Sequence, residues 1–262
     1  LPTDAFNNSY MKSVRKTMID GQVPASCLKC FEEEQQGIAS KRLWETGTWM
    51  YEEGLDLKEL IGETSEDGEV PHKLRYLDLR LGNTCNLKCI MCSPHDSSKW
   101  VGDHNKVFPK FKSELIVKQM GWDKTKHNNF WHENPEFWEQ VYDQIPNITQ
   151  LYFAGGEPLI INEHRMFLTE IIRQGYASKI SLRYNTNGIL VNDEIIDIWK
   201  QFKKVKVGVS LDGMGDRVNY IRYPTDWKTV EENLHKLDNT PDNIYCNIAL
   251  CVQLLNIKHI PD

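Results

Sequence analysis

The sequence predicts an α/β fold built on a parallel sheet. Apolar runs with the two-residue period of β-strands alternate along the chain with runs of helical period. The first four strand candidates also end in cysteine, glycine or polar residues. Strands that alternate with helices form parallel sheets joined by right-handed crossovers. With 262 residues, 40% of them hydrophobic, the chain can bury a sizeable core in one large domain or two modest ones.

A helical segment is predicted near the start of the chain. Met11, Val14 and Met18 recur at helical spacing, and an asparagine or serine within residues 7–9 can cap the helix. The chain opens on Leu1 without a methionine, so we expect further sequence to precede it.

A polar stretch at residues 62–73 is the predicted domain boundary. We therefore expect an N-terminal segment of helices and loops over residues 1–70. The α/β domain is expected over residues 71–262, with its C-terminal end truncated.

The predicted sheet has five strands, each recognised as an apolar or alternating run. These strands cover residues 74–81, 148–156, 179–186, 204–211 and 243–252. Helical periodicity fills the later gaps, at residues 137–145, 167–172, 193–202 and 226–237.

The connection between the first two strands, residues 82–147, is unusually long. It holds four of the eight tryptophans, namely Trp100, Trp122, Trp131 and Trp138. Long structureless loops are uncommon in compact domains, so extra helices are expected there. They could cover one end of the sheet or simply pack as additional helices.

Charge and hydropathy exclude some function classes. The formal net charge of −6 argues against broad affinity for nucleic acids or anionic membranes. No apolar run approaches the roughly 18 residues that a membrane span requires. We expect a cytoplasmic protein that binds neither nucleic acid nor membrane.

The seven cysteines fall into three groups. An odd number does not suit a complete disulfide framework, and thiols two or three residues apart are often metal ligands in a reducing compartment. Cys246 and Cys251 lie in an apolar run and are predicted to be buried free thiols. The other groups are candidates for metal binding.

The ends of the predicted strands carry the residues best suited to chemistry. In parallel α/β folds, ligands bind at the carboxyl ends of the strands. Those ends carry four short motifs in chain order: Cys85–Cys92, Gly155–Glu157, Asn185–Gly188 and Ser210–Gly213. Glycines allow close approach of a ligand, and the polar side chains offer hydrogen bonds. Taken alone, the two glycine-containing motifs could also be ordinary turns.

Cys85, Cys89 and Cys92 form the most specific motif, with spacing Cys-x3-Cys-x2-Cys. Three thiolates suit an iron–sulfur cluster or zinc, and three ligands on one loop leave a coordination position open. His95 could complete a Cys₃His zinc site instead.

The ordered motifs "CNLKCIMC", "GGEP", "NTNG" and "VSLDG" together resemble the radical S-adenosylmethionine (SAM) superfamily. The resemblance covers about residues 74–252. It implies a partial (β/α)6 TIM-like barrel, whose sixth strand would lie beyond residue 262. It also implies that Cys85, Cys89 and Cys92 hold a [4Fe–4S] cluster with SAM chelated to the fourth iron.

The resemblance assigns the remaining site residues to SAM. Gly155, Gly156 and Glu157 would hold its amino group, while Met91 would lie near the adenine. Asn185 or Asn187, with Ser210 and Asp212, would contact the ribose or the methionine end. Arg222 resembles an arginine that pairs with the SAM carboxylate in relatives with an additional cluster domain.

The N-terminal stretch "FNNSYMKSVRKTMIDGQVPASCLKCFEEEQQGIASKR" resembles the end of a twitch-type auxiliary cluster segment, which is related to SPASM domains. Cys27 and Cys30 would then ligate a second iron–sulfur cluster, with its other ligands upstream of Leu1. Two thiols do not define a metal, so zinc or an empty pair remains an alternative.

The resemblance implies an enzyme in which an electron, supplied by a donor such as flavodoxin or ferredoxin, cleaves SAM reductively. The resulting 5′-deoxyadenosyl radical would abstract hydrogen from a substrate. A peptide or protein substrate and a small sugar or alcohol are both open, and a non-enzymatic zinc-binding module is the alternative class.

Overall fold

A computed structural model describes residues 5–107 and 130–260. The chain divides into two compact units, residues 1–73 and 74–262, which are described separately below. Trp122 and the middle of the long connection between the first two strands lie outside the described residues.

The first unit is helical. It contains α2 (Ser9–Ile19), α3 (Leu28–Gln35), α4 (Lys41–Gly47) and α5 (Leu57–Gly62), with a 3₁₀ turn at Ala25–Cys27 and a π-helical turn at Thr48–Glu52. Asn8 caps α2 by accepting a hydrogen bond from the Met11 amide, as the sequence allowed. Ser40 and Asp56 cap α4 and α5 in the same way.

The first unit closes by contacts between α2 and the turn near residue 68. The Lys12 ammonium group pairs with Asp67 and Glu69, at 2.9 and 2.6 Å. Arg15 donates hydrogen bonds to the carbonyl oxygens of Gly68 and Phe6. These contacts tie the two ends of the unit together.

The second unit contains the predicted parallel sheet. Its strands are β1 (Tyr76–Arg80), β3 (Gln150–Ala154), β4 (Ser181–Thr186), β5 (Lys204–Ser210) and β7 (Ile244–Ala249), ordered β1-β3-β4-β5-β7. Every neighbouring pair is parallel. The α/β class and all five strands are confirmed, each slightly shorter than the sequence pattern indicated.

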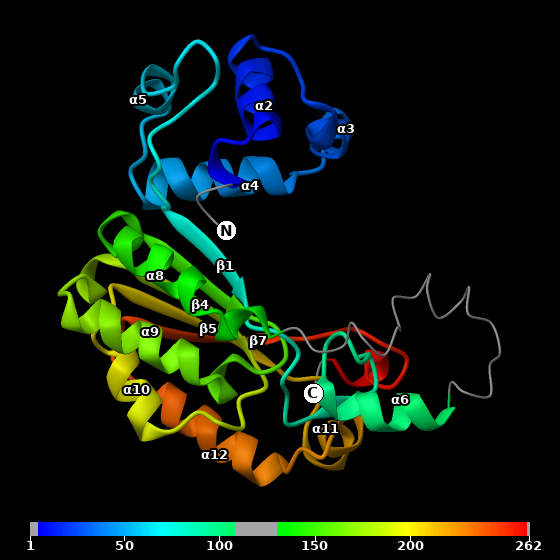
Figure 1. Ribbon diagram of the computed structural model, residues 1–262. Helices are drawn as coiled ribbons and strands as arrows, with labels where there is room; N and C mark the ends of the chain where they lie inside the picture. The colour runs from blue at the N-terminus through cyan, green and yellow to red at the C-terminus, as the bar shows by residue number, and fades with distance from the viewer. Residues whose placement is uncertain (1–4, 108–129, 261–262) are drawn as a thin grey trace. The chain divides into compact units, whose positions relative to one another are not determined.

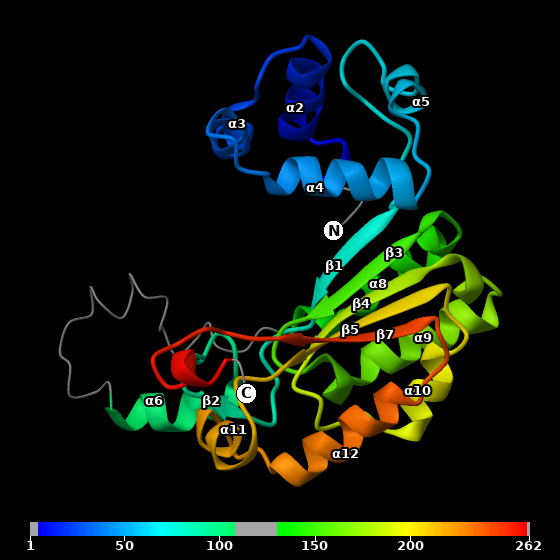
Figure 2. The ribbon, with the colours of Figure 1, turned by 180° about the vertical axis from the view of Figure 1, so that it is seen from behind.

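The helices of the second unit lie against one face of this sheet (Figures 1 and 2). They are α8 (Pro135–Gln144), α9 (Asn162–Arg173), α10 (Asp193–Trp199) and α12 (Trp227–Asp238). The core between the two layers is apolar and includes Phe153, Leu182 and Val207 from the strands. Sequential parallel strands with helices on one side have the topology of an open (β/α) barrel, whose inner face is the other side of the sheet.

The carboxyl end of the sheet carries smaller elements. A two-residue strand β2 (Lys88–Cys89) pairs antiparallel with β6 (Arg222–Tyr223). Helices α6 (Val101–Val107) and α11 (Gly215–Ile221) accompany this pair. Neither the β2–β6 pair nor α11 was predicted, because runs this short carry no periodic signal.

The prediction that Cys251 is a buried thiol is wrong. Strand β7 ends at Ala249, and Cys251 lies exposed beyond it, while Cys246 is half-buried. The chain leaves the sheet there because the Cys251 amide donates to the Asp212 carboxylate, at 2.8 Å, instead of to a neighbouring strand.

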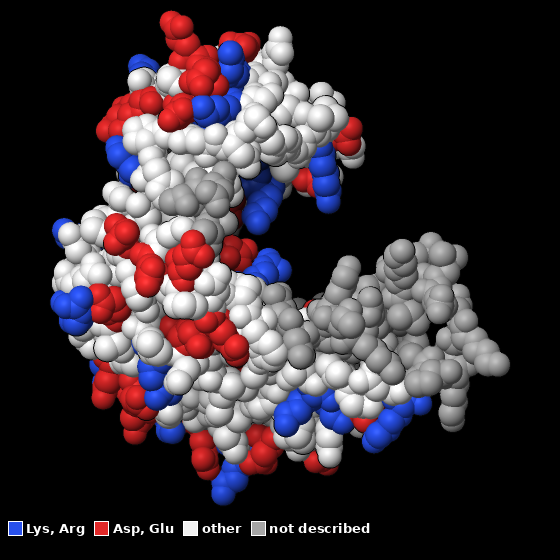
Figure 3. Space-filling view, in the orientation of Figure 1, with Lys and Arg blue, Asp and Glu red and all other residues white. Residues whose placement is uncertain are grey.

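On the face that Figure 3 shows, acidic and basic side chains are interspersed over the described part of the second unit. Within the described ranges, no helix is both long enough and apolar enough to cross a bilayer.

One buried polar contact in the second unit makes stability depend on pH. His164 of α9 and Tyr184 of β4 are buried, and the His164 Nε2 atom lies 2.8 Å from the Tyr184 hydroxyl. Burial lowers the pKa of His164 to about 3. This pKa is depressed below the unfolded value of about 6.5. The contribution of neutral His164 to the stability of the folded state is therefore complete above pH 6.5 and falls as the pH drops toward 3.

We therefore expect the free energy of unfolding to fall by about 2 kcal/mol between pH 7 and pH 5 through His164 alone. The double variant His164→Leu/Tyr184→Phe, which removes both polar partners, should lack this part of the pH dependence. Urea unfolding at the two pH values measures it, with exposed His235→Gln as the control. An identical pH dependence in the double variant and the control would contradict the assignment.

Candidate functional site

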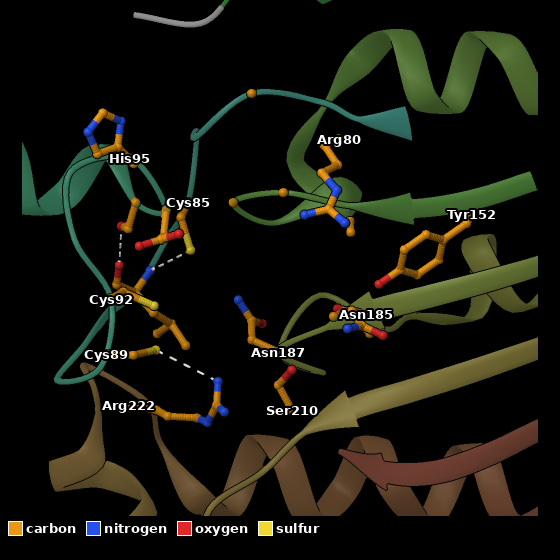
Figure 4. Close-up of a pocket in the computed structure, with 18 residues that line it drawn as sticks. Arg80, Cys85, Cys89, Cys92, His95, Tyr152, Asn185, Asn187, Ser210 and Arg222 are labelled. Carbon is orange, nitrogen blue, oxygen red and sulfur yellow. Dashed lines mark hydrogen bonds between the residues drawn. The ribbon is translucent and has the colours of Figure 1, made fainter. Parts of the chain in front are cut away.

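A cavity of about 450 Å³ lies where the carboxyl ends of the first four strands meet the cysteine loop. Drug-sized ligands occupy pockets of roughly 300–1,000 Å³. Figure 4 shows the cysteines on one side of the cavity and Arg80, Tyr152 and Asn185 on the other. Its lining includes eight residues predicted from the sequence: Cys85, Cys89, Cys92, Gly155, Gly156, Asn185, Asn187 and Ser210, together with Arg222, which the superfamily resemblance indicated.

The cysteine loop is held by its own hydrogen bonds. The Ser97 hydroxyl donates to the Leu87 carbonyl oxygen, and the Trp100 indole donates to the Cys89 carbonyl oxygen at 3.0 Å. The Asn83 side chain donates to the Pro94 carbonyl oxygen at 2.8 Å. These contacts close the loop on itself and fix the direction of its thiols.

All three predicted thiols line the cavity. Cys85 and Cys89 are buried and Cys92 is half-buried. Burial raises the pKa of Cys85, whereas a hydrogen bond from Cys92 and the charge of Arg222 lower the pKa of Cys89. The loop therefore gathers thiols of different acidity around one space.

His95 also lines the cavity, so the histidine of the zinc hypothesis lies on the same loop and faces the same space. Among the described residues, no three His, Cys, Asp or Glu side chains are gathered closely enough to hold a single metal ion. The three thiols and His95 therefore lie on one loop along one side of the cavity.

Arg222 lies beside the cysteine loop because β6 pairs with β2. Its backbone is in register with Cys89, and its guanidinium donates to the Cys89 sulfur at 3.8 Å. Its Nε atom lies 2.7 Å from the Asp212 Oδ2 atom, an ion pair without hydrogen-bond geometry. Arg222 is thus a positive charge fixed at the edge of the cavity.

Asp212 lies next to Arg222, behind the lining of the cavity. It is fully buried and is not part of the cavity lining. Its carboxylate accepts from the Cys251 amide and pairs with Arg222. The structure therefore connects Asp212 to the cavity through Arg222.

Gly155 and Gly156 bring the end of β3 against the cysteine loop. The Gly156 amide donates to the Gly82 carbonyl oxygen at 3.0 Å, and the Glu157 amide donates to that of Thr84 at 2.9 Å. A Cβ atom on Gly156 would lie 2.2 Å from the Thr84 carbonyl oxygen, which is too close for any side chain. Gly155 has φ +119°, where residues other than glycine are strained.

Glu157 faces the neighbouring strand and does not line the cavity. Its carboxylate accepts hydrogen bonds from the Thr186 hydroxyl at 2.7 Å, the Asn187 amide at 2.8 Å and the Leu159 amide at 3.2 Å. Burial raises its pKa, while these three bonds act in the opposite direction. Glu157 therefore joins the ends of β3 and β4.

Polar residues at the carboxyl ends of β4 and β5 complete the cavity wall. The Asn187 side chain donates to Asn86 of the cysteine loop at 2.7 Å and accepts from the Ile189 amide at 3.0 Å. Asn185 is exposed, and Ser210 is half-buried. Met91 is 38% exposed and does not line the cavity.

Sequence reasoning missed Arg80 and Tyr152, which line the cavity opposite the cysteines. The alternation of side chains along the strands could have identified them. Arg80 follows the core residue Leu79, and Tyr152 lies between the core residues Leu151 and Phe153, so both face the inner side of the sheet.

Cys27 and Cys30 lie in the first unit, at the start of α3, and both are half-buried. Arg42 is their charged neighbour. Its pKa is raised chiefly by hydrogen bonds to Glu34 and further by the nearby Cys30 and Cys27. The pair therefore lies beside a cation.

An open (β/α) barrel with a thiol-lined cavity at its carboxyl end defines a class of cofactor-binding α/β proteins. Residues 79–248 match the model of the Radical SAM superfamily, and the chain belongs to it. Members of this superfamily are enzymes that use a [4Fe–4S] cluster and SAM.

Curated relatives include the GTP 3′,8-cyclase of Clostridium botulinum strain Okra, which is 25% identical over 165 residues. That match covers 63% of this chain and 43% of the cyclase. An uncharacterised protein of Methanocaldococcus jannaschii is 24% identical over 142 residues, covering 54% of this chain and 40% of that protein. The chain thus spans less than half the length of these relatives.

Two similar solved structures are titled native anSMEcpe with bound AdoMet, and the same protein with AdoMet and the Kp18Cys peptide. They are 19% and 20% identical, with TM-scores of 0.49 and 0.44. Each alignment covers 71% of this chain, and 47% and 46% of the solved chains. The family assignment rests on the sequence match.

The tight contact at Gly156 predicts that Gly156→Ala will destabilise the second unit by about 1–3 kcal/mol, a typical range for an overpacked site. The added Cβ must push Thr84, and with it the start of the cysteine loop, away from β3. Urea unfolding measures the change. Gly102→Ala is the control, since a Cβ there meets no atom within 4 Å and alanine suits helix α6. Equal unfolding free energies for the two variants would refute the contact.

Proposed function

We propose that this chain is the catalytic domain of a radical SAM enzyme, in which Cys85, Cys89 and Cys92 bind a [4Fe–4S] cluster with SAM beside it. The observation that carries the proposal is the placement of these three thiols around one cavity at the carboxyl end of the barrel. When bound, the cluster supplies the electron that cleaves SAM to methionine and a 5′-deoxyadenosyl radical, which takes hydrogen from the substrate.

The donor set of the cavity fits this pair of groups. Three thiolates are the usual superfamily ligands for an iron–sulfur cluster, and Arg222 beside Cys89 offsets part of their negative charge. Backbone at Gly155 and Gly156 and the side chains of Asn185, Asn187 and Ser210 would contact SAM. The cavity offers them hydrogen-bonding groups that approach from three strands.

We propose that Arg222 pairs with the carboxylate of SAM, because it is the guanidinium at the cavity edge nearest the thiols. Asp212 would orient it, since their ion pair fixes the guanidinium from behind. A direct contact of Glu157 with the SAM ammonium group stays a prediction. It requires the carboxylate to exchange one of its three hydrogen bonds. Met91 near the adenine and Asp212 beside the ribose or the methionine end of SAM also stay predictions.

The first unit is proposed to be the twitch-like segment, with Cys27 and Cys30 as two ligands of an auxiliary iron–sulfur cluster. Support comes from the Cys-x2-Cys spacing and from the half-exposed position of both thiols beside Arg42. In this proposal, residues 1–70 form the auxiliary segment and residues 71–262 the barrel domain.

The auxiliary segment also supports a substrate class. We propose a peptide or protein substrate, because the first unit resembles segments of peptide-modifying relatives. A one-electron donor such as flavodoxin or ferredoxin would reduce the cluster in the cytoplasm, where thiols are kept reduced.

The central test replaces Cys85, Cys89 and Cys92 together with alanine. Anaerobically reconstituted wild-type protein should hold about four irons at these thiols, and the triple variant should lose them. It should also form no 5′-deoxyadenosine from SAM and dithionite. Iron analysis and chromatography measure the two effects. The matched control is Cys246→Ala/Cys251→Ala, which removes thiols away from the cavity and should keep both. Unchanged iron in the triple variant would refute the proposal.

The auxiliary site is tested in the full-length protein, in the background of the triple variant, where only other ligands can hold iron. Any iron that remains after reconstitution should disappear when Cys27→Ala and Cys30→Ala are added. The control adds Cys246→Ala and Cys251→Ala instead. Equal iron in the full-length triple variant before and after Cys27→Ala and Cys30→Ala are added would remove the twitch assignment.

A further inference from the structure

A row of polar side chains crosses the inner face of the sheet, below the cavity. Residues in parallel register across the five strands form this row: Asp78, Tyr152, Arg183, Lys206 and Tyr245. Their alternate neighbours pack against the helices. The inner layers of closed (β/α) barrels are filled mainly by bulky branched apolar residues. A row of this composition therefore differs from ordinary barrel packing.

Arg183 and Lys206 are adjacent cations within this row. They are in direct register on β4 and β5, and neighbouring strands lie about 4.8 Å apart. Like charges directly opposite each other in a sheet destabilise it. Both side chains are half-buried, which weakens screening by solvent. The pair therefore costs stability unless an anion lies between the two charges.

The described part of the chain supplies no such anion. The carboxylate of the row, Asp78, lies two strands from Arg183 and is engaged by Arg80, at 3.3 and 3.4 Å. In the described ranges, neither Arg183 nor Lys206 makes an ion pair. Arg183 instead lies over the Tyr152 ring, 5.7 Å from its centroid.

Tyr152 connects this row to the cavity, which it also lines. Burial and the nearby Asp78 raise the pKa of its phenol, so the hydroxyl stays protonated and can donate a hydrogen bond. Two cations and a neutral donor are a suitable set for an oxyanion.

The next row along the strands connects these cations to the cofactor cavity, because its residues Arg80, Ala154 and Asn185 line that cavity. It contains Ala154, Asn185 and Gly208, two residues further along each strand. Gly208 has no side chain, and the Asn185 side chain lies over it, 3.2 Å from where a Cβ atom would be. Two residues of strand span about 7 Å, so a substrate could reach from the cations to the cavity.

We propose that Arg183 and Lys206 bind an oxyanionic group of the substrate, a carboxylate or a phosphate, and so orient its reacting carbon toward the cofactor cavity. The inference rests on the proposed function for the identity of the cavity. It adds a substrate class, namely molecules or peptide segments that carry an anionic group. That group would lie about 7 Å, or two residues of strand, from the site of hydrogen abstraction.

The test measures anion binding without SAM or reductant, so it is independent of SAM cleavage. Isothermal titration at low ionic strength is run with inorganic pyrophosphate and, separately, with glutarate. The double variant Arg183→Gln/Lys206→Gln should bind the preferred anion on the order of a hundredfold more weakly, because two charge-assisted hydrogen bonds are lost. Pyrophosphate preference would indicate a phosphorylated substrate, and glutarate preference a carboxylate.

The matched control is Arg173→Gln/Lys228→Gln, which removes one arginine and one lysine from exposed positions on α9 and α12. It should bind as the wild type does. Arg183→Lys, which keeps the charge, should retain most of the affinity even if the double variant folds poorly. Failure of the wild type to bind either anion, or equal binding by the two double variants, would overturn the inference. Failure of the proposed function is measured separately, by iron content that is unchanged in the triple cysteine variant.

Discussion

The close backbone contact between the end of β3 and the cysteine loop is the constraint on which the site depends. The Gly156 and Glu157 amides donate to carbonyl oxygens of Gly82 and Thr84, and this approach is possible only without a side chain at Gly156. The contact places the start of the cysteine loop directly against the sheet. Without it, the spacing of the thiols along the chain would not determine where they lie relative to the other strand ends.

Two buried carboxylates extend this constraint to the rest of the cavity wall. Glu157 holds the end of β4 through Thr186 and Asn187, and Asn187 in turn holds Asn86 of the cysteine loop. Asp212 holds Arg222 on one side and the chain beyond β7 on the other. Each carboxylate therefore connects elements that are distant in sequence and positions part of the cavity wall.

The strands and the cysteine motif could be predicted from the sequence because their signals are local. Alternation along residues 204–211 and the spacing of Cys85, Cys89 and Cys92 need no knowledge of distant residues. The orientation of Glu157 and Asp212 could not be predicted, since it depends on which partners the fold brings near. The β2–β6 pair is two residues long and gives no periodic pattern, although it brings Arg222 to Cys89. For Cys251, the apolar run suggested burial, but the hydrogen bond to Asp212 ends the strand earlier.

Alternate residues of each strand have different roles, because successive side chains point to opposite faces of the sheet. Residues such as Leu151, Leu182 and Val205 pack against the helices and stabilise the barrel, whereas their neighbours Tyr152, Arg183 and Lys206 face inward. An inward-facing residue can change without creating a void in the helix-packed core. Relatives with this barrel could therefore acquire new substrates by substitutions at alternate positions while folding by the same contacts. A strand of six residues thus carries about three positions open to functional change and three that maintain the fold.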